Sequence, residues 1–296
     1  MRSRSVLGDL DGRVVLLTGA TDGVGRAAAT EFAARGATLT IVGRDETKTR
    51  RTAEVLRQTT GNPAVDTLIA DLSSLRGMRA VTAGFLARRG RLDILVNNAG
   101  ALFQRPAVTV DGLEMTFALN HLAYFVVTTE LIGLLRETPG ARVVNTTSSA
   151  HRFGRLDVEH MPTRSRGAGF ASGFRVYCDS KMANVVFTQE LSRRLSPFGV
   201  TANCLHPGFV RSRFFGQTTG PWGYATRNPL ANLVARPPER AADTLVWLAT
   251  DPAAAAHSGE YFINRAVRTV SRRTRDERLR SRLWALSERL VAPPTW

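Results

Sequence analysis

Two residues of one predicted helix have the types and the spacing of an acid/base pair. Tyr177 stands four residues before Lys181, so both side chains are expected on the same helix face. A tyrosine hydroxyl titrates at about pH 10, and a neighbouring ammonium favours the phenolate and lowers this pKa. The pair therefore has the chemistry of a general acid/base for interconverting an alcohol and a carbonyl.

The rarity of lysine in this chain makes the pair hard to attribute to chance. All but two of the 40 basic residues are arginine, and the two lysines are Lys48 and Lys181. Arginine would supply the same charge, whereas a compact ammonium with rotatable donors can also hydrogen-bond the hydroxyls of a nicotinamide ribose. Lys181 is therefore predicted to serve the acid/base chemistry.

Two further polar residues are predicted to complete this site. Ser148 follows the predicted strand 141–147, at the sheet edge where ligands of parallel sheets bind, and its hydroxyl can donate to a substrate oxygen. Its neighbour Ser149 is the less favoured choice. Asn120 lies inside a predicted helix over 113–136, where asparagine is a poor helix former. This misfit predicts that Asn120 either holds a water for proton relay or bends the helix.

A glycine-rich segment predicts a binding site for the pyrophosphate of a dinucleotide. Residues 18–25 read TGATDGVG and lie between a predicted strand and a predicted helix. Gly19 permits the tight turn, while Gly23 and Gly25 let phosphates and the neighbouring strand approach the backbone. The other predicted cofactor contacts of this loop are Thr21, Asp22 and Val24.

The tip of the second predicted strand bears on the choice between NADP(H) and NAD(H). An acid there would bind the ribose hydroxyls and repel a 2′-phosphate, but Gly43 stands at this position. Arg44 follows and can bind a 2′-phosphate, so NADP(H) is predicted in preference to NAD(H). At the tip of the third strand, Asp71, with Leu72 beside it, is predicted to bind the adenine amine. The alternative for Asp45 and Asp71 is capping of the helices that follow.

The order of apolar runs predicts the fold class. Strand-like segments alternate with helix-like segments, which is typical of an α/β protein. We expect a Rossmann-type doubly wound parallel sheet of about seven strands, flanked by helices. Residues 1–296 are predicted to form a single dinucleotide-binding catalytic domain, in which the helix 176–195 carries Tyr177 and Lys181.

Composition narrows the class of partner. The formal net charge is +15, but the arginines are spread along the chain, which favours a solvated surface over a nucleic-acid partner. No stretch has the length of a membrane helix, so a cytoplasmic protein without a membrane partner is predicted. Cys178 and Cys204 are predicted to be free thiols, and the histidines and cysteines do not have metal-ligand spacing.

These motifs together resemble the short-chain dehydrogenase/reductase family, from about Gly12 to Ile263. TGATDGVG is similar to the family's cofactor loop, and NNAG at 97–100 to the motif after its fourth strand. The residues that match its catalytic tetrad are Asn120, Ser148, Tyr177 and Lys181. The resemblance implies further cofactor contacts from Asn98, Ala99, Gly100, Pro207, Gly208, Val210 and Ser212. Ser212 departs from the threonine that is usual in the family, although a serine can still donate a hydrogen bond.

The resemblance is sharper to the branch that contains retinol dehydrogenases and protochlorophyllide reductases. The similar features are GRD at 43–45, NHL at 120–122, SSAH at 148–151 and YCDSK at 177–181. The resemblance implies NADP(H) and hydride transfer between nicotinamide C4 and a carbonyl or alcohol carbon. It also implies that Tyr177 moves the proton, Ser148 holds the oxygen and Lys181 lowers the pKa of Tyr177.

The remaining predictions concern the substrate, the assembly and a rival function. The segments 152–173 and 209–238 are expected to select the substrate, and four aromatic residues in the second predict a lid over an apolar or aromatic small molecule. They are Phe214, Phe215, Trp222 and Tyr224. The basic helical extension 265–296 either packs on the core or forms the interface of a homo-oligomer. A non-catalytic dinucleotide sensor is the alternative function, and the intact tetrad disfavours it.

Overall fold

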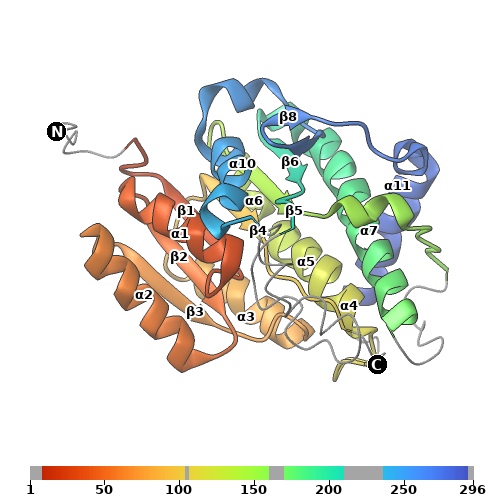
Figure 1. The fold of residues 1–296 in the computed structure, drawn as a ribbon, viewed down its shortest axis with the longest axis horizontal. Coiled ribbons are helices and arrows are strands. Elements are labelled where there is room, and N and C mark those ends of the chain that lie inside the picture. Colours follow the sequence, from red (N-terminus) through yellow and green to blue (C-terminus); the bar gives the residue numbers. More distant parts are fainter. Residues whose placement is uncertain (1–8, 104–106, 160–169, 210–235, 293–296) are drawn as a thin grey trace.

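An eight-stranded sheet lies at the centre of the fold (Figure 1). The structure, a computed structural model, describes residues 9–103, 107–159, 170–209 and 236–292. The strand order is β3-β2-β1-β4-β5-β6-β7-β8, and all neighbouring pairs are parallel except β7 and β8. The strands are β1 (Val14–Thr18), β2 (Thr38–Gly43), β3 (Val65–Ile69), β4 (Ile94–Asn97), β5 (Arg142–Thr146), β6 (Thr201–Leu205), β7 (Tyr261–Ile263) and β8 (Ala266–Val267).

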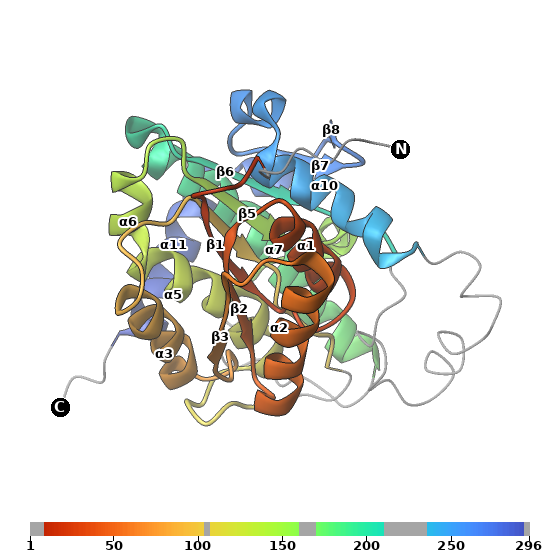
Figure 2. The same cartoon turned by 90° about the vertical axis from the view of Figure 1, so that its left-hand side faces the viewer.

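Helices cover both faces of this sheet (Figures 1 and 2). One face is buried by α1 (Gly23–Ala34), α2 (Glu46–Thr60) and α10 (Pro238–Thr250). The other is buried by α3 (Leu75–Leu86), α5 (Ala123–Glu130) and α7 (Phe170–Leu195). With a helical layer on each side, the central strand β1 is buried along its whole length, as its apolar sequence requires. The predicted class, a doubly wound Rossmann-type sheet, is confirmed.

The strand order reverses at β1, which places a ligand crevice at one edge of the sheet. The chain moves from β1 outward to β3, then returns to add β4 on the opposite side of β1. In such sheets ligands bind outside the carboxyl ends of the strands that flank this reversal. The strands end there at Thr18 and Asn97, so the glycine loop and the NNAG segment both begin at the crevice.

The helix predicted over 113–136 is in fact a series of shorter segments. α4 (Met115–Phe117) passes into a π-helical turn, η1 (Ala118–Leu122), which is followed by α5 and then by α6 (Ile132–Glu137). A π-turn accommodates one extra residue in its hydrogen-bonded ring and is frequent at functional sites. Asn120 lies at the centre of this turn.

The structure also differs from the prediction at the far edge of the sheet. The eighth strand, β8, pairs antiparallel with β7 and is absent from the predicted set of about seven strands. The two residues between them, Asn264 and Arg265, both have positive φ, at 55° and 58°. Positive φ at both positions is the geometry of a type I′ hairpin, which usually contains glycine. Without a glycine, the hairpin has no clear signal in the sequence.

The predicted substrate segments are described only in part. α7 begins at Phe170, six residues before the start of the predicted helix 176–195, so the end of the segment 152–173 is helical. A short 3₁₀ helix, η2 (Ser149–Phe153), lies at its other end. The aromatic residues of the predicted lid lie outside the described residues. Among the helices of the described ranges, none is long and apolar enough to cross a membrane.

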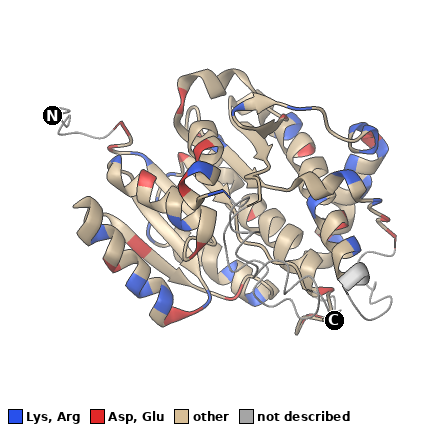
Figure 3. Ribbon diagram, viewed as in Figure 1, with Lys and Arg blue, Asp and Glu red and all other residues tan. Residues whose placement is uncertain are grey.

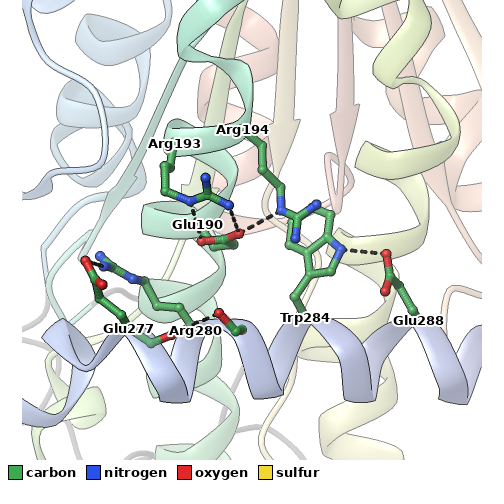
Figure 4. Close-up of polar contacts among 8 residues, drawn as sticks. Glu190, Arg193, Arg194, Glu277, Arg280, Trp284 and Glu288 are labelled. Atoms are coloured by element: carbon green, nitrogen blue, oxygen red, sulfur yellow. Dashed lines mark hydrogen bonds and ion pairs between the residues drawn. The ribbon is translucent and has the colours of Figure 1, made fainter.

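The C-terminal helix α11 (Glu277–Val291) packs on the core beside α7 (Figure 4). Trp284 is 7% exposed, and its ring meets Phe125 edge-on at 5.0 Å and stacks on Phe187 at 5.9 Å. The guanidinium of Arg194 lies 3.9 Å from the centre of the same ring, and the indole Nε1 donates to Glu288 Oε1 at 2.7 Å. Of the two roles predicted for this extension, packing on the core is therefore present in the structure.

We predict that Trp284→Ala lowers the free energy of unfolding by about 3 kcal/mol, because truncating a buried tryptophan removes its contacts and leaves a cavity. Urea denaturation followed by circular dichroism would measure the loss. Arg289→Ala, an exposed position on the same helix, is the control and should change stability by less than about 0.5 kcal/mol. Equal midpoints for Trp284→Ala and wild type would contradict this account of α11.

Candidate active site

The glycine loop packs so closely on neighbouring backbone that Gly19 and Gly25 have no room for a side chain. A Cβ added at Gly25 would lie 2.1 Å from the carbonyl oxygen of Gly19, and one at Gly19 would lie 2.7 Å from Ala99 Cα. Gly19 and Gly23 also have positive φ, at 69° and 49°. This packing requires glycine at positions 19 and 25, and α1 begins directly after the loop at the carboxyl end of β1. A helix N-terminus in this place can bind phosphate oxygens through its N–H groups, which is the predicted role of the loop.

The predicted residues Thr21, Asp22 and Val24 lie within this turn. Asp22 caps α1 by accepting a hydrogen bond from the backbone N–H of Gly23 at 2.8 Å. Its other carboxylate oxygen lies 3.3 Å from Nζ of Lys48, which comes from α2. The sequence analysis did not select Lys48 as a site residue. The available signal was its rarity, because it is one of only two lysines in the chain.

Asn98 joins the ends of three strands. Its Nδ2 donates to the carbonyl oxygens of Thr18 and Gly19, at 3.3 and 3.1 Å, and its Oδ1 accepts from Thr146 Oγ1 at 3.2 Å. Gly100 follows closely, and a Cβ there would lie 3.0 Å from Asn120 Oδ1. The NNAG segment therefore connects the glycine loop to the predicted catalytic residues, which meet at the same crevice.

Tyr177 and Lys181 both project from α7 toward this crevice and are buried, with exposed fractions of 8% and 3%. Lys181 Nζ donates to the carbonyl oxygen of Thr146 at 3.1 Å and lies 5.8 Å from the centre of the Tyr177 ring. Ser148 caps η2 at the end of β5 and forms a side-chain hydrogen bond with Tyr177. The predicted triad of tyrosine, lysine and serine is thus gathered in one place.

Burial shifts the pKa values of Tyr177 and Lys181, and the sequence did not predict these shifts. Desolvation raises the pKa of Tyr177 above its ordinary value, and the hydrogen bond with Ser148 offsets only part of this rise. Desolvation also lowers the pKa of Lys181 to about 7. Without a cofactor, desolvation is the largest influence on the Tyr177 pKa, and the predicted lowering of this pKa by Lys181 stays a prediction.

Asn120 is fixed by the protein through both ends of its amide. Nδ2 donates to Ala101 O and Ser180 Oγ, each at 3.0 Å, and Oδ1 accepts from Ala101 N–H at 2.9 Å. The side chain is fully buried. With these contacts the side chain joins α7 to the segment after β4, and the helix is distorted at this position. Asn120 thus lies in a distorted turn of its helix, and the predicted water for proton relay stays a prediction.

Two residues that sequence analysis did not assign to the site hold the segment after Ser148. His151 is buried and its Nδ1 lies 2.7 Å from the carbonyl oxygen of Ser148. Asp179 Oδ1 accepts from the backbone N–H groups of Arg155 and Leu156, at 2.6 and 2.9 Å. Both residues occur in the quoted motifs SSAH and YCDSK, but only their three-dimensional contacts show that they position the end of β5 against α7.

The capping role predicted as an alternative is present at the tip of β2 but not at the tip of β3. A Cβ at Gly43 would lie 2.2 Å from Thr49 Oγ1, so an acidic side chain does not fit there. Arg44 is exposed and Asp45 caps α2, as its alternative role required. Asp71 is exposed beside the buried Leu72 and accepts from Ser73 N–H at 2.9 Å, but it is not a helix cap. The cap of α3 is Ser74.

The segment after β6 is described only as far as residue 209. Pro207 and Gly208 follow the strand, and Gly208 has a φ of 93°. A Cβ at Gly208 would lie 2.9 Å from Arg236 Cδ. The other predicted cofactor contacts of this segment, Val210 and Ser212, lie outside the described residues.

Charged side chains of both signs are distributed over the described ranges of the chain. Basic and acidic side chains are interspersed over the helices (Figure 3), and α7 and α11 carry ion pairs such as Arg193–Glu190 and Arg280–Glu277. Within those ranges, no group of three or more His, Cys, Asp or Glu side chains could hold a metal ion. Cys178 and Cys204 are free and buried, which agrees with the predicted thiols.

Comparison with known proteins defines the class to which this fold and site belong. The family model described as short chain dehydrogenase matches residues 13–160. Human retinol dehydrogenase 13 is 37% identical over 286 residues, which cover 95% of this chain and 85% of that protein. The chain belongs to the short-chain dehydrogenase/reductase family, in the branch of the retinol dehydrogenases, and its chemical class is NAD(P)-dependent oxidoreduction.

Solved structures agree with this assignment. The crystal structure of an uncharacterised protein from Mycobacterium paratuberculosis has a TM-score of 0.76 and 29% identity, covering 98% of this chain and 97% of that one. The RhlG protein of Pseudomonas aeruginosa, solved as a complex with NADP, has a TM-score of 0.67 and 28% identity, covering 86% and 94%.

We predict that burial of Lys181 makes the cofactor-free protein less stable at neutral pH than at higher pH. The pKa of this lysine is about 7 in the folded protein and about 10.4 in an unfolded chain. Between these values the unfolded chain binds more protons, so this residue's contribution to stability rises with pH. The stability difference between wild type and Lys181→Met should therefore shift by about 1–3 kcal/mol in favour of wild type between pH 7 and pH 10.

Urea unfolding at several pH values would measure this shift, because buried groups such as Cys178 and Cys204 titrate in both proteins and cancel in the difference. Lys48→Met removes the other, partly exposed lysine and is the matched control. Parallel stability–pH curves for wild type and Lys181→Met would show that the ammonium is not desolvated as described.

Proposed function

We propose that the protein is an NADP(H)-dependent oxidoreductase that interconverts the carbonyl and alcohol forms of an apolar or aromatic small molecule, with Tyr177 as general acid/base. The observation that carries the proposal is the convergence of Tyr177, Ser148 and Lys181 beside the glycine loop. The Tyr177–Ser148 hydrogen bond and the 5.8 Å separation of Lys181 Nζ from the tyrosine ring support it. The family assignment supports the same chemistry.

The residues present fit a dinucleotide. A Cβ at Gly19 or Gly25 would collide with the backbone of the protein itself, so the tight loop requires glycine, and α1 begins directly after this loop at the carboxyl end of β1. When bound, the nicotinamide would supply or accept a hydride and, in its oxidised form, add positive charge to the site. Asn98, Ala99, Gly100, Pro207 and Gly208 follow the carboxyl ends of β4 and β6 and are proposed to hold this part of the cofactor.

Each polar side chain then has a role at a stated atom. Tyr177 Oη donates its proton to the substrate oxygen during reduction and removes it during oxidation. The Ser148 hydroxyl donates a hydrogen bond to that oxygen as charge develops. Lys181 Nζ hydrogen-bonds the ribose and stabilises the phenolate of Tyr177. Because burial raises the pKa of Tyr177, this stabilisation must come from positive charge brought together at the site.

A preference for NADP(H) is supported by charge beside the tip of β2. Gly43 cannot be replaced by the acid that would favour NAD(H), because the space beyond it is occupied by Thr49. Arg44 follows in an exposed position, and Lys48 contributes a second positive charge, with its Nζ 3.3 Å from Asp22 at the glycine loop. Two cations around one phosphate would favour the 2′-phosphorylated cofactor.

An apolar substrate is supported by two exposed aromatic residues and by the relatives. Phe153, at the end of η2, is 72% exposed, and Phe209, which follows Gly208, is 42% exposed. Both lie on segments that leave the crevice, so their rings are suited to contact an apolar substrate. The human relative is named a retinol dehydrogenase, and a large apolar alcohol or aldehyde is proposed for this chain as well.

We predict that Tyr177→Phe keeps its affinity for NADPH but loses turnover by about 10³-fold, because the proton donor is gone while the ring remains. Carbonyl and alcohol panels, including retinal and retinol, would be followed by NADPH absorbance, and NADPH binding by fluorescence. Tyr261→Phe is the control, since its hydroxyl is buried in β7 without a hydrogen-bond partner in the described part of the chain. Turnover by Tyr177→Phe at the wild-type rate would refute the assignment.

A second prediction concerns the cofactor. Arg44→Ala and Lys48→Ala should each weaken NADPH binding by about tenfold and leave NADH binding nearly unchanged, because only NADPH carries the 2′-phosphate. Arg50→Ala is the control, because Arg50 lies on the same helix but is paired with Glu46. Equal weakening for both cofactors would mean that these residues support the fold rather than recognise the phosphate.

A further inference from the structure

We propose that the C-terminal helix α11 positions the active site, with Ser287 acting through His121 on Asn120. The proposal rests on the proposed function to the extent that Asn120 belongs to the catalytic site. It concerns a part of the chain that lies beyond the residues 13–160 matched by the family model.

Asn120 and His121 are consecutive residues of the π-helical turn η1, and they anchor it to two different parts of the protein. Asn120 is bonded to Ala101 and to Ser180 of α7. His121 is fully buried among aromatic rings, with its ring centre 4.9 Å from that of Phe117 and 5.8 Å from that of Phe187. The two side chains therefore fix the turn from both sides.

The Nε2 side of the His121 ring is held by α11. Its Nε2 lies 2.9 Å from Ser287 Oγ, and this hydroxyl donates to Leu283 O at 2.8 Å. Because the single hydrogen of this hydroxyl is directed at Leu283 O, the contact fits an imidazole that donates from Nε2 to Ser287. Burial lowers the pKa of His121 to about 3, so the ring is neutral. Ser287 thus holds the Nε2 side of the ring in place.

α11 is itself held on α7, the helix that carries Tyr177 and Lys181 (Figure 4). Trp284, one turn before Ser287, lies under the guanidinium of Arg194. Glu190 is buried and accepts from both Arg193 and Arg194, at 2.7 and 2.8 Å, which orients the second arginine over the indole. α11 therefore contacts both α7 and η1. The relative position of these two elements determines the hydrogen bond between Asn120 and Ser180.

The consequence for Asn120 follows from the geometry of a π-turn. Such a turn is rare and closes a less favourable hydrogen-bonded ring than an α-helix, so it persists where other contacts fix it. Without the Ser287 hydroxyl, a buried Nε2–H is left without an acceptor, and the ring and its turn are expected to shift. Return to α-helical register would rotate the side chains by about 100° for each residue displaced. Asn120 would then lose its contacts to Ala101 and Ser180.

The test compares Ser287→Ala with Ser281→Ala. Both serines lie on α11 and donate to the carbonyl four residues earlier, but Ser281 is exposed. For a carbonyl that the wild type reduces, kcat of Ser287→Ala should fall by about tenfold with KM for NADPH unchanged. Amide hydrogen exchange, measured by mass spectrometry, should become faster for 118–122. Ser281→Ala should match wild type in both measurements.

A double variant distinguishes an effect of Ser287 on the position of Asn120 from an effect on the stability of the whole fold. His121→Phe combined with Ser287→Ala leaves no buried donor, so its midpoint of thermal unfolding should recover toward wild type. The proposal expects kcat to stay about tenfold low in this variant, because the anchor is still missing. The same variant carries the test if Ser287→Ala alone does not fold. Recovery of kcat together with the unfolding midpoint would overturn the proposal.

The exchange measurement also keeps this inference distinct from the proposed function. If the wild type reduces no carbonyl and oxidises no alcohol in the panel, the proposed function fails, and exchange alone decides the role of α11. Faster exchange confined to 118–122 in Ser287→Ala then supports the proposal. Wild-type exchange in this segment overturns it, whatever the activity.

Discussion

The ammonium of Lys181 is almost entirely withdrawn from water, and the design of the site depends on how this charge is compensated. Removing an ammonium from water costs several kcal/mol unless it is paired. In the described part of the chain no carboxylate pairs with it. Instead, Nζ donates to the Thr146 carbonyl and lies 5.7 and 5.8 Å from the ring centres of Tyr124 and Tyr177. This partial compensation leaves the charge available to a bound nucleotide, and the pKa near neutrality reflects the same balance.

Compensation by a backbone carbonyl requires that the end of β5 and the helix α7 be held at a fixed separation. Gly154 makes this approach possible, since a Cβ there would lie 2.8 Å from both Cys178 O and Met182 Cβ. Thr147 Oγ1 donates to Lys181 O at 2.7 Å, and Asp179 binds the backbone that follows η2. These contacts surround Ser148 in space and sequence, so the interactions that accommodate a buried lysine also orient the serine toward Tyr177.

The parts of the site that sequence could predict are those encoded by local spacing. Tyr177 and Lys181 are four residues apart on one helix, and the glycines of the loop are fixed by backbone geometry, so both signals can be read from a single segment. The misfit of Asn120 predicted either a water site or a bend, but the π-turn and the contacts of Asn120 with Ala101 and Ser180 join residues distant in sequence and could not be predicted. The raised pKa of Tyr177 is likewise a property of burial, which spacing does not specify. The sheet was predictable for the same reason as the glycine loop, except at the Asn264–Arg265 hairpin.

The predicted site is assembled from segments that lie far apart in the sequence. The glycine loop, the NNAG segment and the end of β5 are joined by Asn98. The side chains of the predicted acid/base pair come from α7, which is packed by α11. The geometry of this pair therefore depends on a helix that lies far beyond the recognisable motifs in the sequence.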